Sequence, residues 1–154
     1  MALIIKDMKK IIYMFLAAAM IALTGCKEKD EVQHRIVGEW MYTHEEAGQS
    51  IEIYVSFNID YTFDLYQKVG EGTHRHLTGT YEVDRTIVSG MYSDRTPWAS
   101  DYSVSFNGTD MVMKSVSAEE YTITYKKARI PDEVKNHSVE MTRSGMSEDF
   151  VPCL

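Results

Sequence analysis

Apolar and polar residues alternate along most of the chain between residues 36 and 127. In the clearest case, Ile51, Ile53, Val55 and Phe57 share one face, and the residues between them point the other way. Strict alternation over four to eight residues, rich in β-branched and aromatic side chains, indicates half-buried β-strands. The pattern predicts strands over residues 36–43, 51–58, 61–66, 77–83, 86–92, 102–106, 111–116 and 121–126.

Short turn-forming segments separate these strands, and Asn107-Gly108 is the strongest hairpin signal among them. No long helical pattern interrupts the series, so the prediction is an all-β fold, a small antiparallel up-and-down barrel of eight strands. Closure of the barrel also removes exposed strand edges. A short C-terminal helix is predicted at Pro131–Lys135, where proline and acidic residues favour a helix start. We expect the tail, residues 136–154, to be loosely ordered, although Phe150 and Val151 could dock on the barrel.

The N-terminal segment has the three parts of a secretory signal. Three lysines precede an uncharged apolar run of about 13 residues (11–23), and small residues and Cys26 follow it. The run is too short for a comfortable permanent membrane span, which needs roughly 20 residues. Met8 could be the true start, because Met8-Lys9-Lys10 opens the same pattern more compactly.

Leu23-Thr24-Gly25-Cys26 resembles the lipobox of bacterial lipoproteins. The resemblance implies cleavage before Cys26, a diacylglycerol on its thiol and acylation of the new amino end. It makes residues 1–25 a signal peptide and the charged residues 26–35 a flexible tether. No aspartate directly follows the cysteine, which by resemblance favours the outer membrane. A lysine followed by acidic residues resembles surface-export signals of the Bacteroidetes, and the alternative is an ordinary polar linker. The alternative is a membrane-anchoring helix with an incidental cysteine.

Composition narrows the class of partners. The chain has a formal net charge of −7, and removal of the first 25 residues, with three lysines and one aspartate, would leave about −9. An acidic domain lacks the basic patch that nucleic acid requires, so we expect no nucleic-acid partner. Lipidation of Cys26 would leave Cys153 unpaired, so no disulfide framework is expected and stability must come from the core.

Gly38-Glu39-Trp40 resembles the Gly-x-Trp motif of the lipocalins. In that family the tryptophan closes one end of the barrel, and a basic residue from near the last strand packs over its ring. Here Lys126, Lys127 or Arg129 could take that place. Further segments similar to lipocalin-like lipoproteins are residues 57–63, 79–83 and 130–134.

The chain also departs from the lipocalin pattern. Tyr61 stands where the related lipoproteins usually have glycine, and Thr109-Asp110-Met111 matches the late lipocalin motif only in part. The barrel segment is also short for a lipocalin that carries a ligand. An eight-stranded barrel can hold one small ligand or fill with its own side chains. The resemblance therefore implies the fold more strongly than the function.

Two sets of residues are candidate binding sites. The first is an interior apolar pocket, for which the alternative is a packed core. Its lining residues would be Trp40, Phe57, Phe63, Tyr81 and Phe106. The second is the loop of residues 91–100, where an exposed Trp98 could stack on a sugar or a protein partner. The alternative for this loop is a lid whose Trp98 covers the barrel mouth.

Histidines and acidic residues give little indication of chemistry. His74 and His76 share one face of a strand, but Arg75 lies between them, and zinc needs three or four converging ligands. No motif typical of a hydrolase, a zinc protease or a phosphate-binding loop is present. We therefore expect no metal, no cofactor and no enzymatic activity.

These patterns together predict a lipid-anchored, monomeric protein of the cell envelope. The expected divisions are a signal peptide (1–25), a tether (26–35), a lipocalin-like barrel (36–130) and a short helix with a tail (131–154). The first functional hypothesis is a non-enzymatic binding protein for a small hydrophobic ligand. The alternative is a scaffold or interaction module that docks an envelope protein or glycan through its loops.

Overall fold

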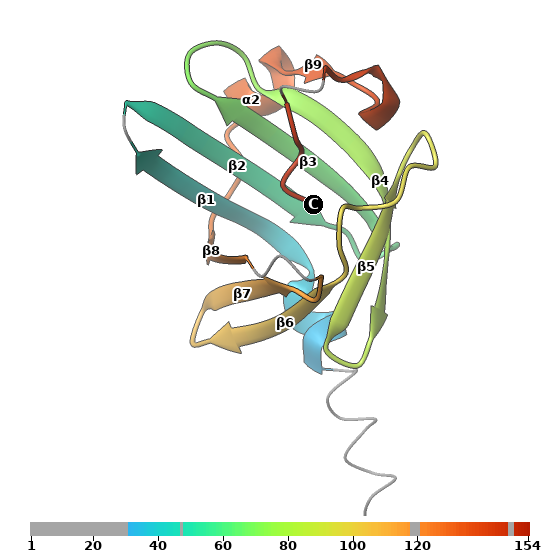
Figure 1. Ribbon diagram of the computed structural model, residues 1–154. Coiled ribbons are helices and arrows are strands. Elements are labelled where there is room, and N and C mark those ends of the chain that lie inside the picture. Colours follow the sequence, from blue (N-terminus) through green and yellow to red (C-terminus); the bar gives the residue numbers. More distant parts are fainter. Residues whose placement is uncertain (1–30, 47, 118–120, 148–149) are drawn as a thin grey trace, which may run out of the picture.

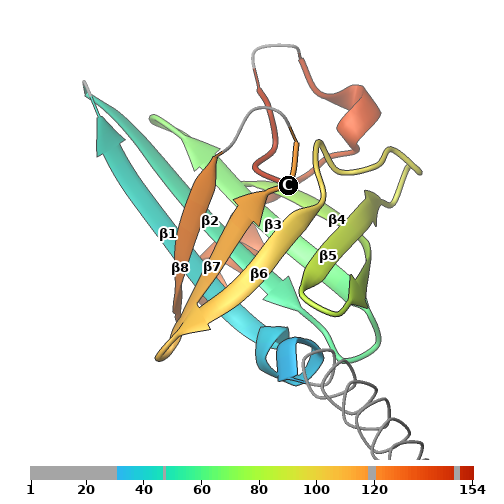
Figure 2. The ribbon, with the colours of Figure 1, turned by 60° about the horizontal axis from the view of Figure 1, so that its bottom comes forward.

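The computed structural model describes residues 31–46, 48–117, 121–147 and 150–154. Eight antiparallel strands form a closed barrel (Figures 1 and 2), which confirms the predicted all-β class. They are β1 (Gly38–Glu46), β2 (Gln49–Phe57), β3 (Thr62–Val69), β4 (Arg75–Asp84), β5 (Ile87–Tyr92), β6 (Tyr102–Asn107), β7 (Asp110–Ser115) and β8 (Thr122–Lys127). Each strand pairs with the next and β8 pairs with β1; the shortest pairings are β5 with β6 and β8 with β1, at two residue pairs each.

Two turns show how local sequence sets the strand register. The Asn107-Gly108 turn joins β6 to β7, and Gly108 has a φ of 61°, the left-handed conformation that such hairpins require. Tyr61, in the turn before β3, has a φ of 64°. Glycine adopts such a left-handed backbone more readily than tyrosine does.

One end of the barrel is closed by residues 31–36, which are helical (Figure 2). Val32 and Ile36 lie one helical turn apart and are buried in the barrel core. Arg35 donates a hydrogen bond to the Gly108 carbonyl at 2.8 Å and lies over the ring of Phe106. The structure thus corrects the expected tether for residues 31–35, because two apolar residues anchor an otherwise charged segment. The signal peptide, Cys26 and the rest of the tether lie outside the described residues.

The outer wall of the barrel carries helix α2 (Asp132–His137), as predicted after Pro131. Ile130 and Val134 bury their side chains against Tyr54 and Tyr66 on the outside of β2 and β3. Strand β9 (Val139–Glu140) then pairs in parallel with the start of β4, and a 3-10 turn, η1 (Arg143–Gly145), follows. These elements add a small second layer to one side of the barrel (Figure 1).

The prediction of a loosely ordered tail is wrong for residues 136–147 and 150–154, the part of the tail that the structure describes. Residues 150–154 enter the end of the barrel opposite to residues 31–36 (Figure 1). Phe150 and Leu154 are buried, and Leu154 joins the main core cluster. Val151, the other residue expected to dock, is 62 % exposed. We call residues 150–154 the C-terminal strap.

Candidate functional site

Trp40, the tryptophan of the Gly38-Glu39-Trp40 segment, lies at one end of the barrel. Trp40 is buried near the end of the barrel closed by residues 31–36, and its Nε1 donates to the Ile36 carbonyl at 2.8 Å. Lys127 Nζ lies 4.9 Å from the centre of the Trp40 ring, so Lys127 is the basic residue that packs over it. The sequence had left this choice open between Lys126, Lys127 and Arg129.

The residues expected to line an interior pocket do come together. Phe57, Phe63 and Tyr81 are almost fully buried, as is Trp40, and Phe106 is partly buried. Phe57 and Tyr81 meet edge to face with ring centres 5.1 Å apart, and Trp40 and Phe106 are separated by 6.1 Å. Such spacings are those of aromatic pairs in contact. The geometry supports the alternative interpretation, in which these side chains form a packed core.

Trp98 lies inside the barrel wall and is only 5 % exposed, so the hypothesis of an exposed stacking residue is wrong. Its ring stands over Gly90, meets Phe63 edge to face at 5.2 Å, and lies 6.0 Å from Tyr102. The absence of a side chain at Gly90 makes room for the indole. Trp98 Nε1 is buried and has no hydrogen-bond partner among the described residues. The loop is therefore a plug in the seam between β5 and β6.

The end of the barrel opposite to residues 31–36, which we call the mouth, holds the C-terminal strap through a side-chain amide. Gln67 lies near the end of β3, and its side chain faces inward and is buried. Its Nε2 donates to the Val151 carbonyl at 3.1 Å. Its Oε1 accepts a hydrogen bond from the Cys153 amide at 2.9 Å. One glutamine thus pairs with both a carbonyl and an N–H group of the strap, as a neighbouring β-strand would.

Three tyrosines from three parts of the barrel complete the contacts with the strap. Tyr92 donates to the Leu154 carbonyl at 2.6 Å, and Tyr102 and Tyr121 both donate to the Cys153 carbonyl. Burial raises the pKa values of these phenols, so they remain protonated donors at neutral pH. Burial also raises the pKa of the Cys153 thiol to about 12, which leaves it an unreactive thiol. We call Gln67 and these tyrosines the mouth residues.

Sequence reasoning missed the mouth residues. Tyr92, Tyr102 and Tyr121 resemble ordinary strand residues, since aromatic residues are common in strands. The one available signal was Gln67, a polar residue on the same inward face as Phe63 and Leu65. A buried amide needs partners for both its donor and its acceptor, and that requirement could have pointed to a polar segment at this end.

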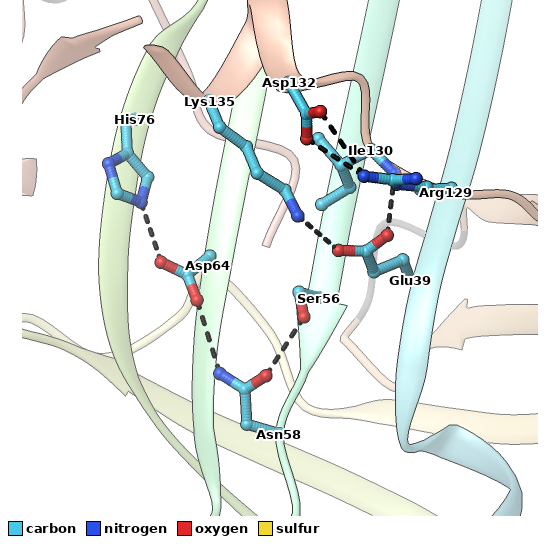
Figure 3. Close-up of polar contacts among 9 residues, drawn as sticks. All are labelled: Glu39, Ser56, Asn58, Asp64, His76, Arg129, Ile130, Asp132 and Lys135. Carbon is cyan, nitrogen blue, oxygen red and sulfur yellow. Dashed lines mark hydrogen bonds and ion pairs between the residues drawn. The ribbon is translucent and has the colours of Figure 1, made fainter.

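A polar network on the outer wall fastens α2 to the barrel (Figure 3). Glu39 accepts hydrogen bonds from Lys135 Nζ at 2.6 Å and from the Ile130 amide at 2.8 Å. Burial raises the pKa of Glu39, but these hydrogen bonds and the nearby positive charges outweigh burial and hold it below its usual range. Glu39 is therefore ionised at neutral pH and ties the segment before α2 to β1.

A second part of this network joins β2, β3 and β4. Asp64 receives a hydrogen bond from His76 Nε2 at 2.9 Å, which is the main cause of its lowered pKa. Asn58 links Asp64 to Ser56, so the serine hydroxyl is separated from the histidine by two side chains (Figure 3). A serine nucleophile needs its histidine base within hydrogen-bond reach. Here Asn58 and Asp64 stand between Ser56 and His76, so these two do not form such a pair.

The two histidines predicted to share a strand face bind different carboxylates. His74 Nε2 lies 2.7 Å from Glu52, whereas His76 pairs with Asp64. Burial lowers the pKa of His74, against the opposing charge of Glu52. His74 and His137 line a surface groove of about 420 Å³ between α2 and the wall, and His76 is not part of its lining. Within the described part of the chain, no three histidine, cysteine, aspartate or glutamate side chains converge in a way that could hold a metal.

In the ranges that the structure describes, no helix is both long enough and apolar enough to cross a membrane. Comparisons of the chain with protein-family models, with curated proteins and with solved structures found no match.

Proposed function

We propose that the protein is a lipid-anchored lipoprotein of the cell envelope and a non-enzymatic binding module built on a solid barrel. The lipobox-like residues ending at Cys26 support the anchor. The packing of the interior carries the rest of the proposal. Because Phe57, Phe63 and Tyr81 contact other core side chains, we assign binding to the mouth of the barrel and to its outer surface.

The small-molecule carrier remains a prediction from the sequence, and the geometry favours it less. A ligand carrier uses a cavity of roughly 300 to 1,000 Å³ that encloses most of the ligand. Three hollows lined by described residues, of about 420, 470 and 480 Å³, reach this size, and all three open at the surface. The inward-facing aromatic positions are occupied by side chains that touch one another.

The proposal is tested by mass spectrometry under non-denaturing conditions on the full chain, extracted from its own membrane. We expect the mass of the processed chain with acyl groups on Cys26, no stoichiometric small molecule, and a retained protein or glycan partner. A Cys26→Ser variant is the matched control and should lose the acyl mass and the membrane association.

Each result bears on a different part of the proposal. An unmodified N-terminal segment on the mature protein would contradict the lipid anchor. A stoichiometric apolar molecule that leaves only on unfolding would restore the carrier hypothesis and contradict the solid barrel. Crosslinking on intact cells that recovers no partner would contradict the interaction module.

A further inference from the structure

We propose that the mouth of the barrel is a binding site for an extended peptide, and that the C-terminal strap of the same chain occupies this site. This inference rests on the proposed role as a binding module and names the chemistry of the partner. The partner would present a segment with the pattern of residues 150–154, an aromatic residue, a proline and a leucine at alternate positions.

The contacts made by the mouth residues are directed at peptide backbone. Gln67 pairs with the Val151 carbonyl and the Cys153 amide, two groups that flank one residue of an extended chain. Beyond the Cys153 amide, Tyr102 donates to the Cys153 carbonyl and Tyr92 donates to the Leu154 carbonyl. Main-chain hydrogen bonds combined with side-chain pockets at alternate positions are the usual basis for recognition of an extended peptide.

The side chains of the strap alternate as this mode of binding requires. Phe150, Pro152 and Leu154 face the protein and are buried, whereas Val151 faces solvent. Leu154 is only 1 % exposed and packs in the barrel core, and the guanidinium of Arg75 lies 4.0 Å from the centre of the Phe150 ring. These three side chains would carry the specificity of the site, and Val151 would not contribute.

The lining of the mouth is suited to an exchangeable occupant. The strap is not part of the β-sheet, so it can leave without breaking a strand pairing. Its departure would expose phenol and amide groups, which water can satisfy. A purely structural core would place apolar side chains at these inward positions, because unpaired buried polar groups are costly. Gln67 and the tyrosines therefore allow both a filled and an open mouth.

The covalent link sets how strongly an outside peptide must compete. A segment that is covalently linked to its own binding site acts at a high effective concentration, of about millimolar for a short link. A peptide in trans would therefore bind the native chain poorly, even where its intrinsic affinity for the mouth is good. Weakening the strap without touching the mouth residues should reveal that affinity.

The test uses a fluorescent peptide, Phe-Val-Pro-Cys-Leu, and its fluorescence anisotropy with the full chain under reducing conditions. The Leu154→Lys variant places a charge at the buried anchor and should bind the peptide at least tenfold more tightly than the unaltered chain. Val151→Lys is the matched control, since it adds the same charge at an exposed position of the strap, and its affinity should equal that of the unaltered chain. A peptide with lysine in place of leucine should not bind to any of the three.

Equal peptide binding by folded Leu154→Lys and Val151→Lys chains would overturn the proposal. If Leu154→Lys does not fold, a protease site is placed at residues 147–149 of the otherwise unaltered chain and cut after folding. Exchange of the labelled peptide into the cut protein supports the site, and failure to exchange overturns it. Failure here leaves intact any partner found by mass spectrometry, so the two proposals can fail separately.

Discussion

Replacing Gly90 by alanine tests whether Trp98 is the plug that the geometry indicates. A Cβ atom at Gly90 would lie 2.2 Å from Trp98 Cε2 and 2.4 Å from Cζ2, where ordinary contact begins at 3.4 Å. Gly90 has no left-handed backbone angle, so the substitution adds a steric clash without backbone strain. The indole is flanked by Phe63 and Tyr102 and has little room to move aside.

The expected cost follows from the burial of Trp98. Removing a buried tryptophan typically costs about 3–5 kcal/mol. Trp98 Nε1 has no partner among the described residues, and a buried N–H group without a hydrogen bond destabilises the fold by about 1–3 kcal/mol. Removing it therefore offsets part of the lost packing. We therefore expect Trp98→Ala to lower the free energy of unfolding by roughly 2–4 kcal/mol. Gly90→Ala should approach the same loss, because it displaces the same ring.

A double-mutant cycle separates this clash from an unrelated effect at Gly90. Once Trp98 is alanine, a methyl group at position 90 has space, so the double variant should be no less stable than Trp98→Ala alone. Urea unfolding of the four proteins gives the free energies, and the tryptophan emission of Gly90→Ala should shift to the red as the indole becomes exposed. Additive losses in the double variant would refute the plug.

The remaining predictions concern the outer wall. Burial lowers the pKa of His74 in the folded state, so the unfolded chain binds more protons, and stability should fall as the pH drops below about 6.5. Urea midpoints measured from pH 7.5 to 5 should therefore depend less on pH in His74→Gln than in the unaltered chain. An unchanged pH dependence would contradict this. Lys135→Met removes the partner of Glu39 and should cost about 1 kcal/mol or less, since the pair is partly exposed. Arg129→Met, whose pair with Asp132 is far more exposed, is the control, and a larger loss there would contradict the assignment.

The barrel could be predicted because its signal is repeated along the chain. Alternation at period two forces one face inward in every strand, and eight strands joined by short turns have few ways to bury those faces. The same regularity placed Phe57 and Phe63 together correctly. Whether they enclose space or fill it depends on side-chain volumes and on Trp98, and a pattern along the chain does not report volume.

The segments that close the barrel could not be predicted in this way. Residues 31–36 bury only the side chains of Val32 and Ile36, and so short a helical stretch among charged residues shows no measurable periodicity. The strap is held by Gln67 and by tyrosines distant in sequence, through contacts with its backbone. Backbone contacts leave little trace in side-chain patterns, so the tail appeared featureless.

The positions of these two closures have a consequence for how the protein would be presented at a membrane. Residues 31–36 close one end of the barrel, and the strap fills the other (Figures 1 and 2). An extended chain spans at most about 3.6 Å per residue, so a lipid on Cys26 would lie within about 18 Å of Glu31. The anchor would then hold the first end near the lipid and turn the mouth residues away from it. A partner peptide would then reach Gln67 from the side opposite the membrane. Binding there would not require the mouth end of this acidic domain to approach an anionic lipid surface.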